Sequence, residues 1–528
     1  MGENSATNGD RAVTERPARK SPAGASEEIP SGEILLAIDQ GTSSSRAIAF
    51  GLDGALIATE QQAFEQLYPA SGWVEHDAEV IWATVLSTTR AVLERLRVQK
   101  RGPIVAVGIT NQRETTVVWD RRTGAPIYNA IVWQDRRTAD RCRKLAEGGH
   151  EAEVAEKTGL LLDPYFSATK LAWILDKVPG SRELAKAGHI AFGTIDSFLI
   201  WRLTRGRLHV TDATNASRTA LFDIRKGCWD ESLCELFNVP LSCLPEVRDS
   251  AGDFGTTEAS VLGEPLPIRG VAGDQQAALI GQACFAAGDL KSTYGTGAFM
   301  VLNTGEKLVR SANRLLSTIG YQLNGKITYA LEGSILSAGS TIQWLRDGLG
   351  LVSRAPEVEA LARSVTDTGG VYLVPAFTGL GAPYWDPDAR GTLVGLTRAS
   401  GRGEIARAGL DSVAYQTRDL LDAMAADKIR PPALKVDGGM AQNGLFLQRL
   451  ADILNLPVLR PKMAESTAFG AACLAGLGAG LYTSLNDVAS LWKPDAKCEP
   501  QLDSASRERD LAGWRAAVNR TLTPQTKP

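Results

Sequence analysis

Histidine and cysteine are scarce in this chain of 528 residues, which contains four of the first and seven of the second. The histidines stand at positions 76, 150, 189 and 209, and the cysteines at 142, 228, 234, 243, 284, 473 and 498. They form no Cys-X-X-Cys pair and no pair at the spacing of zinc ligands. We therefore expect neither a zinc site nor a disulfide framework, and the scattered, odd set of cysteines favours a reducing compartment.

The chain also lacks long apolar runs and a strong net charge. No stretch of about 18 apolar residues occurs, so no membrane span is expected, and the N-terminus has no apolar signal-peptide core. Lysine and arginine together number 57 against 60 for aspartate and glutamate. This balance gives no broad basic field to attract nucleic acid or an anionic membrane. We expect a soluble, cytoplasmic protein with no nucleic-acid partner and no membrane insertion.

Length and composition predict two large domains between two tails. Hydrophobic residues make up 44% of the chain, enough for sizeable cores, and single cores stop growing near about 250–300 residues. Residues 1–31 are rich in Ser, Gly, Pro and charge, which predicts a disordered tail. We place the first domain at residues 32–280, the second at 281–510, and a C-terminal tail at 511–528.

Strand and helix patterns alternate along both predicted domains. Strand patterns cover residues 34–38, 47–50, 104–109, 299–303, 319–323, 371–375 and 433–437. Helical apolar spacing covers residues 77–100, 403–427, 443–455 and 466–477. Strands such as 104–109 have no polar face, as in a sheet covered on both sides. The pattern predicts an α/β protein.

Three turns rich in glycine and hydroxyl groups follow predicted strands. The first is AIDQGTSSSR at residues 37–46, the second STYGTGAF at 292–299, and the third DGGMAQN at 437–443. Backbone N–H groups and hydroxyls in such turns can surround an anion, and the carboxylate of Asp39 suits Mg²⁺ held through water. For the first stretch taken alone, a simple polar turn is an equally good interpretation.

A fourth stretch, GYQLNGK at residues 320–326, matches the spacing of a phosphate-binding P-loop. However, Ile327 stands where that loop requires Ser or Thr. The pair Asn324-Gly325 between two strand patterns is instead typical of a two-residue hairpin turn. We therefore expect a hairpin here and no phosphate site.

The order of the three turns resembles that of the actin/Hsp70/sugar-kinase ATPases. Within that group, YFSATK at residues 165–170 and GTLVGLT at 391–397 resemble the signatures of the FGGY carbohydrate kinases. Segments that resemble the glycerol-phosphorylating branch of this family stand at 72–77, 108–116, 129–134, 273–276 and 375–386. The resemblance covers about residues 33–518. It implies an α/β fold of two RNase H-like (actin/Hsp70-type) domains with a nucleotide cleft between them.

The resemblance also implies an activity, ATP:glycerol 3-phosphotransferase, with Mg²⁺ as cofactor. Glycerol and ATP would be converted to sn-glycerol 3-phosphate and ADP, the first step of glycerol catabolism. The family's substrate residues correspond here to Arg113, Glu114, Trp133, Tyr165, Asp274, Gln275 and Phe299. Asp274 corresponds to the catalytic carboxylate, which would orient the attacking hydroxyl.

The implied nucleotide site draws on both domains. Its residues correspond to Thr42, Ser43, Ser44, Arg46, Thr296, Gly339, Gln343, Gly439 and Asn443, with Asp39 near the metal. The first domain would hold glycerol and the phosphate loop, and the second the adenine nucleotide. Because relatives assemble as dimers and tetramers, a homodimer or homotetramer is implied.

Two other functions fit parts of the pattern. One is another FGGY kinase, acting on xylulose, gluconate or erythritol. The other is a non-catalytic ATP-binding clamp of the actin/Hsp70 kind. The stretches GWVEHD at 72–77 and Arg113-Glu114 favour the glycerol branch over another FGGY kinase. An ATP-binding clamp would not need residues for a second substrate.

Overall fold

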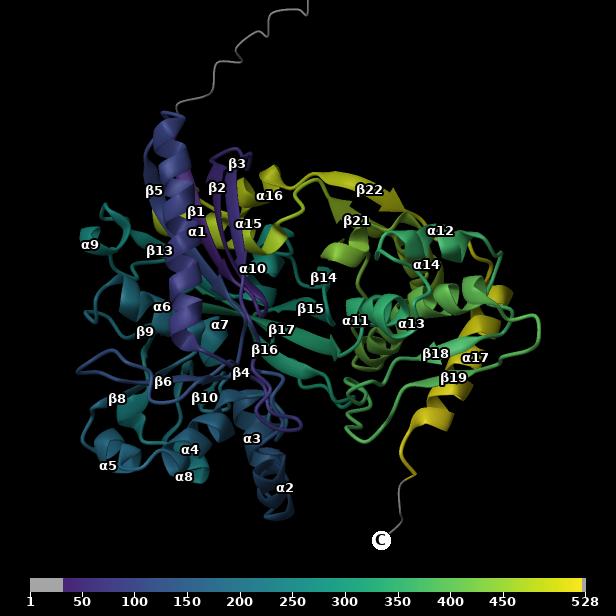
Figure 1. Cartoon of the computed structure of the whole chain (residues 1–528), viewed down its shortest axis with the longest axis horizontal. Coiled ribbons are helices and arrows are strands. Elements are labelled where there is room, and N and C mark those ends of the chain that lie inside the picture. The colour runs from purple at the N-terminus through teal and green to yellow at the C-terminus, as the bar shows by residue number, and fades with distance from the viewer. Residues whose placement is uncertain (1–31, 525–528) are drawn as a thin grey trace, which may run out of the picture.

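The computed structural model describes residues 32–524, which form two α/β domains lying side by side (Figure 1). The tail predicted at residues 1–31 lies outside the described residues. The first domain is built on a five-stranded sheet and the second on a seven-stranded sheet. Two helices, α10 (Asp274–Gly281) and α15 (Ser466–Gly478), lie between the two sheets.

The sheet of the first domain has the strand order β3-β2-β1-β5-β13. Its strands are β3 (Leu56–Ala63), β2 (Ser44–Gly51), β1 (Ile34–Gln40), β5 (Ile104–Asn111) and β13 (Ile268–Gly273). The first three strands of the chain are antiparallel neighbours, whereas β5 and β13 run parallel to β1. Helix α1 (Ala78–Val98) packs with Ile34, Leu36 and Ile38, and α15 packs with Leu35 and Ala37. Strand β1 is therefore buried on both faces, which explains its unbroken apolar sequence.

The sheet of the second domain repeats this arrangement. Its strand order is β16-β17-β15-β14-β20-β21-β22. The strands are β14 (Leu290–Tyr294), β15 (Ala298–Gly305), β16 (Leu316–Leu323), β17 (Lys326–Ile335), β20 (Leu434–Asp437), β21 (Val458–Pro461) and β22 (Pro494–Cys498). Again antiparallel neighbours, β14, β15 and β17, are followed by parallel strands, β20 and β21. The shared order confirms two domains of the predicted RNase H-like type.

The remaining elements cover the two sheets and extend the first domain. In the first domain they are β4 (Glu75–His76), β6 (Val117–Asp120), β7 (Ala130–Ile131), β8 (Ile190–Gly193), β9 (Val210–Asp212), β10 (Phe222–Asp223), β11 (Cys228–Trp229), β12 (Glu246–Arg248), α2 (Ala139–Glu147), α3 (Glu151–Thr158), α4 (Ser167–Lys177), α5 (Ser181–Lys186), α6 (Ile195–Leu203), α7 (Ala213–Ala216), α8 (Glu231–Phe237) and α9 (Ala259–Leu262). In the second they are α11 (Gly339–Gln343), α12 (Glu357–Arg363), β18 (Tyr372–Val374), β19 (Thr392–Val394), α13 (Arg402–Ala426), α14 (Gly444–Leu454), α16 (Leu485–Leu491) and α17 (Ser504–Thr521). Every strand and helix predicted above overlaps an observed element.

The stretch at residues 320–326 is a hairpin, as predicted. Strands β16 and β17 pair antiparallel, and Leu323 faces Lys326 across the turn. Asn324 and Gly325 both have positive φ, at 51° and 72°, as a type I′ turn requires. The P-loop interpretation is excluded because no helix follows the glycine.

The prediction of a C-terminal tail at residues 511–528 is wrong for most of this segment. Helix α17 runs to Thr521. Its Trp514 is fully buried, stacks on Tyr415 with ring centroids 5.3 Å apart, and donates from Nε1 to Asp419 Oδ2 at 2.8 Å. Charged residues occupy exposed positions of α17, among them Glu508, Arg509 and Arg515, whereas Trp514 lies on the opposite, buried face.

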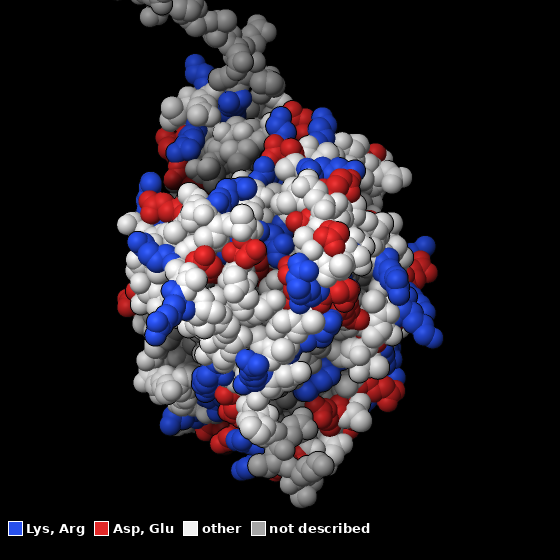
Figure 2. All heavy atoms as spheres, turned by 90° about the vertical axis from the view of Figure 1, so that its right-hand side faces the viewer, with Lys and Arg blue, Asp and Glu red and all other residues white. Residues whose placement is uncertain are grey.

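The surface carries charges of both signs. Figure 2 shows one face of the molecule, on the side of the second domain, with Lys and Arg interspersed with Asp and Glu. On this face, no broad basic area is visible, in line with the near balance of charges in the sequence. No helix among residues 32–524 is long and apolar enough to cross a membrane.

Candidate active site

The turn between β1 and β2 joins an acid and a base at its two ends. Asp39 and Arg46 are cross-strand partners, and Arg46 Nη2 lies 3.0 Å from Asp39 Oδ2. The same guanidinium donates from Nη1 to Glu465 Oε2, in the loop before α15, at 2.6 Å. Gly41 N donates to Ser44 O at 2.9 Å and closes the turn. The turn is thus fixed between the domains.

The predicted hydroxyl groups line this turn. Ser43 is exposed at the tip, whereas Thr42 is half-buried. Thr42 Oγ1 accepts a hydrogen bond from Trp133 Nε1 at 3.0 Å, and Ser44 Oγ accepts one from Gln61 Nε2 at 2.9 Å. The first of these bonds ties the turn to the predicted glycerol site.

Asp39 fits the donor chemistry of a Mg²⁺ site. Its side chain is buried, and its Oδ2 atom has the ion pair to Arg46 but no hydrogen bond. Burial raises the pKa of Asp39, and Arg46 opposes that rise. Within residues 32–524 no group of three or more His, Cys, Asp or Glu side chains is placed to hold a metal ion. Because Mg²⁺ is commonly held by one or two carboxylates plus substrate phosphates, a single carboxylate is sufficient here.

Arg113 is the centre of the predicted glycerol site. It follows the carboxyl end of β5, where ligands bind in open α/β sheets. Its Nε lies 3.3 Å from Asp274 Oδ1, and its Nη2 donates to Tyr165 Oη at 3.4 Å. The next residue, Glu114, has a φ of 58° and is buried. Side chains from three separate segments therefore meet at one guanidinium.

Three aromatic rings form the apolar wall of this site. The ring of Trp133 lies with its centroid 5.7 Å from that of Tyr165 and 5.8 Å from that of Phe299. The guanidinium carbon of Arg113 lies 5.8 Å from the centroid of Phe299. The structure thus brings the predicted polar and apolar groups into one cluster.

Asp274 is the first residue of α10 and its side chain is 29% exposed. Burial raises the pKa of Asp274, while the positive charges of Arg113 and Lys291 lower it. Its Oδ1 accepts a hydrogen bond from the backbone N–H of Gln275 at 2.7 Å. The carboxylate is therefore held by one arginine and one amide, with an open side.

The side chain of Gln275, another predicted glycerol residue, is bonded to a lysine of the second domain. Its Oε1 accepts a hydrogen bond from Lys291 Nζ at 2.5 Å. Lys291 is fully buried on β14, also donates to Thr293 Oγ1 at 3.0 Å, and has its pKa lowered by burial to about 8. Gln275 therefore links α10 to the second domain, and its side-chain oxygen is already paired.

Sequence reasoning missed two charged residues at this site, Glu332 and Arg218. Glu332, on β17, forms a two-pronged ion pair with Arg113, and Arg218 contacts both Glu332 and Glu114. Both missed residues are completely buried. Neither lies in a recognisable motif, and only the fold places them beside Arg113.

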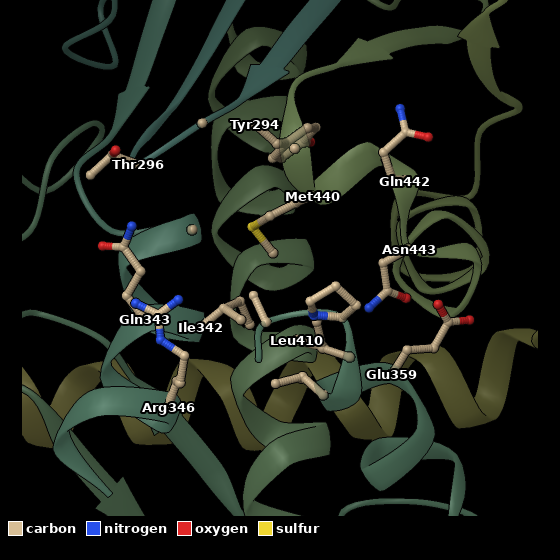
Figure 3. A pocket seen from close by; sticks show the side chains of 16 residues that line it. Tyr294, Thr296, Ile342, Gln343, Arg346, Glu359, Leu410, Met440, Gln442 and Asn443 are labelled. Atoms are coloured by element: carbon tan, nitrogen blue, oxygen red, sulfur yellow. The ribbon is translucent and has the colours of Figure 1, made fainter. Parts of the chain in front are cut away.

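A cavity of about 370 Å³ opens in the second domain (Figure 3). The predicted nucleotide residues of this domain all line it, namely Thr296, Gly339, Gln343, Gly439 and Asn443. Apolar side chains of Ile342, Leu410 and Met440 form its inner part in Figure 3, with Gln343 and Arg346 on one side and Asn443 on the other. Asn443 Oδ1 also caps α14 by accepting from Phe446 N at 2.9 Å.

The β14–β15 hairpin connects this cavity to the glycerol site. Its turn residues Gly295 and Thr296 line the cavity, and Phe299 on the same hairpin contacts Trp133. The cavity and the predicted glycerol site therefore share one hairpin.

Comparison with known proteins agrees with this geometry. Residues 34–281 match the N-terminal domain, and residues 290–479 the C-terminal domain, of the FGGY family of carbohydrate kinases. The chain is 61% identical to the glycerol kinase of Alcanivorax borkumensis over 92% of this chain and 98% of that protein. It is 58% identical to glycerol kinase 1 of Pseudomonas aeruginosa over 92% of this chain and 98% of that protein.

Among solved structures, the chain is similar to the Plasmodium falciparum glycerol kinase determined with ADP. The TM-score is 0.86 at 38% identity, over 93% of this chain and 99% of that one. A gluconate kinase from Lactobacillus acidophilus shares the fold, with a TM-score of 0.81 at 21% identity over 92% of this chain and 97% of that one. By sequence and by structure, this chain belongs to the FGGY family of carbohydrate kinases.

Proposed function

We propose that this chain is a glycerol kinase, which transfers the γ-phosphoryl group of ATP to glycerol and releases sn-glycerol 3-phosphate and ADP. The observation that carries the proposal is the cluster around Arg113, where the side chains of Asp274 and Tyr165 meet the rings of Trp133 and Phe299. The β14–β15 hairpin joins this cluster to a cavity lined by the predicted nucleotide residues. The high identity to several glycerol kinases supports the same substrate.

Glycerol has three hydroxyl groups on a short carbon chain, and this site offers partners for both parts. Arg113 donates, Glu114 and Asp274 accept, and Tyr165 does either. The rings of Trp133 and Phe299 cover the carbon chain. A substrate that lacks one hydroxyl would leave a buried group unpaired, at a cost of about 1–3 kcal/mol.

ATP would occupy the cavity of the second domain and extend its phosphates to the β1–β2 turn. The backbone and hydroxyls of Thr42, Ser43 and Ser44 would donate to phosphate oxygens, and Arg46 would balance their charge. When bound, Mg²⁺ neutralises charge on the transferred group. Asp39 would hold it through water.

Asp274 would orient the attacking hydroxyl and accept its proton. Phosphoryl transfer has a loose transition state in which the proton leaves late, so positioning is the main contribution. The carboxylate is suited to this because Arg113 holds it from one side. Its raised pKa also makes it a somewhat better proton acceptor than a solvated aspartate.

The proposal also covers the cellular compartment and the oligomeric state of the enzyme. We infer a cytoplasmic enzyme from the composition and from the lack of a membrane-spanning helix in residues 32–524. Assembly as a homodimer or homotetramer is inferred from the family resemblance.

The direct test is an ADP-release assay with and without glycerol. We expect ADP release to depend on glycerol and the product to be sn-glycerol 3-phosphate. Xylulose, gluconate and erythritol should each react at least about a hundredfold less efficiently, because their hydroxyls do not match the site. Glycerol-independent hydrolysis would favour the ATP-binding clamp, and preference for another polyol would favour a different FGGY kinase.

A further inference from the structure

A carboxylate from the second domain lies inside the glycerol site of the first. Glu332, on β17, is 0% exposed. Its Oε2 accepts from Arg113 Nη1 at 2.5 Å, and its Oε1 accepts from Arg113 Nη2 at 3.0 Å. This paired geometry fixes a guanidinium in one plane, which a single contact does not do.

Glu332 also contacts a second buried arginine. Its Oε1 accepts from Arg218 Nη2 at 2.9 Å, and Arg218 Nε donates to Glu114 Oε1 at 2.6 Å. The four side chains therefore alternate in charge from Arg113 through Glu332 and Arg218 to Glu114. Arg218 Nη1 has no hydrogen-bond partner among the described residues. Glu332 thus joins the two arginines through hydrogen bonds to both, whereas Glu114 bonds to Arg218 and lies 3.9 Å from Arg113 Nε.

The orientation of Arg113 has a direct consequence for Asp274. Since Glu332 pairs with both Nη atoms, the Nε edge of the guanidinium is the one that faces Asp274, at 3.3 Å. Loss of the pair would allow the arginine to rotate about its terminal torsions. The carboxylate proposed to orient the attacking hydroxyl would then lose its fixed partner.

We propose that Glu332 is a positioning residue that assembles the glycerol site only when the two domains are together. Arg113 belongs to the first domain and Glu332 to the second, so their pair forms across the domain boundary. The inference rests on the proposed glycerol kinase function. It adds that productive binding of the substrate depends on a residue that does not contact it.

The electrostatics support a charged role for Glu332. Burial opposes ionisation, but Arg113 and Arg218 outweigh it and hold the pKa of Glu332 at about 2. The group is therefore ionised throughout the pH range of any kinase assay. Removing the charge would leave two buried cations facing each other, a strongly destabilising change.

The test uses two variants of the full chain. Glu332→Asp keeps the charge but withdraws the carboxylate by one methylene, and Glu332→Gln keeps the shape but removes the charge. We expect kcat with glycerol to fall at least about tenfold in the first and about a hundredfold in the second. The KM for ATP should change by less than about threefold, because Glu332 is not among the residues that line the nucleotide cavity.

Asp249→Asn is a matched control, because Asp249 also joins the two domains. It accepts from Gln322 Nε2 at 2.8 Å and from Gly325 N at 2.9 Å, at the β16–β17 turn. Its loss should leave kcat nearly unchanged while lowering stability slightly. Thermal unfolding of all variants separates an effect on the site from an effect on the fold.

The outcomes separate this inference from the proposed function. A wild-type chain that does not phosphorylate glycerol refutes the function itself. An active wild type with Glu332→Asp retaining kcat and KM within twofold refutes only the positioning role. An equal rise in the KM values for ATP and glycerol with unchanged kcat also refutes the positioning role. A loss of kcat with glycerol in a folded Glu332→Asp variant, with the KM for ATP unchanged, supports the positioning role.

Discussion

Two adjacent glycines after β20, Gly438 and Gly439, have different structural requirements. Gly438 has a φ of 89°, and a Cβ there would lie 2.5 Å from Tyr294 O. A Cβ on Gly439 would meet nothing within 4 Å, and Gly439 lines the cavity proposed to bind the nucleotide. The first glycine is thus required by the fold, whereas the second leaves space in that cavity.

These two positions give a paired prediction. Gly439→Ala should fold with nearly wild-type stability but bind ADP about tenfold more weakly, because the methyl group enters ligand space. Gly438→Ala should lower the free energy of unfolding by about 1–3 kcal/mol through strain and the clash. Calorimetric titration with ADP and denaturant unfolding measure the two effects. Unchanged ADP affinity in Gly439→Ala would place the nucleotide elsewhere.

Asp274 provides the second prediction at the scale of one residue. Asp274→Asn should lower phosphorylation of glycerol at least about a hundredfold, since an amide cannot accept the proton. ADP binding should remain within about threefold, because Asp274 is not among the residues lining the nucleotide cavity. Steady-state kinetics and calorimetry are the measurements. Turnover within tenfold of wild type would show that the assignment is wrong.

The pH dependence of the reaction follows from the same carboxylate. Only the ionised form can accept a proton, so activity is lost as the pH falls through the pKa of Asp274. Because burial raises that pKa above its ordinary value of 3.8, the loss should begin at a higher pH than for a solvated aspartate. A profile of kcat/KM for glycerol against pH tests this, with unfolding followed in parallel. An acid limb at or below the ordinary value would contradict the expectation.

At the scale of elements, helices α10 and α15 cross at unusually close range. A Cβ on Gly281 of α10 would lie 1.9 Å from Ser466 O, and one on Gly470 of α15 would lie 1.8 Å from Ala277 O. Helix α10 lies in the segment that matches the N-terminal domain of the family and α15 in the segment that matches its C-terminal domain, and α15 also covers the first sheet. Their crossing therefore links the domains through backbone contact.

We predict that Gly470→Ala lowers the free energy of unfolding by about 2–4 kcal/mol, since backbone atoms cannot move aside as a side chain can. Gly444→Ala at the start of α14 is the control, because its nearest contacts are side-chain ends at 3.5 and 3.6 Å. Denaturant unfolding of both variants makes the comparison. If the Gly470→Ala and Gly444→Ala variants had equal free energies of unfolding, the close approach of α10 and α15 would not contribute to stability.

At the scale of the whole molecule, charged pairs join the domains. Arg113 pairs with Glu332, and Arg46 pairs with Glu465. The cavity proposed for the nucleotide lies in the second domain, and the turn proposed to bind its phosphates lies in the first. Transfer to glycerol instead of water requires these parts to close together around the substrates.

We therefore predict that the chain becomes more compact on binding glycerol with a non-hydrolysable ATP analogue. We expect the bending to occur near residues 274–285, between the last strand of the first sheet and β14. Small-angle scattering with each ligand alone and with both measures the radius of gyration. A radius that both ligands together leave unchanged would count against closure.

Sequence reasoning predicted most of the elements because their patterns are local. The hairpin turn at Asn324-Gly325 and the apolar strands depend on neighbours a few residues away. It failed at α17, where charged residues conceal a buried face built around Trp514. It also placed α15 with the second domain only, because no local pattern shows which sheet a helix will cover.

The sequence by itself determined the two-domain α/β architecture, the order of the three turns rich in glycine and hydroxyl groups, and the residues that resemble those of carbohydrate kinases. Tertiary structure alone decided the charge network around Arg113. Arg113 and Glu332 are separated by 219 positions, and neither spacing nor composition relates them. The physical reason is that a buried carboxylate is tolerated only where the fold supplies cations, and Arg113 and Arg218 reach Glu332 only after both sheets have formed and packed together.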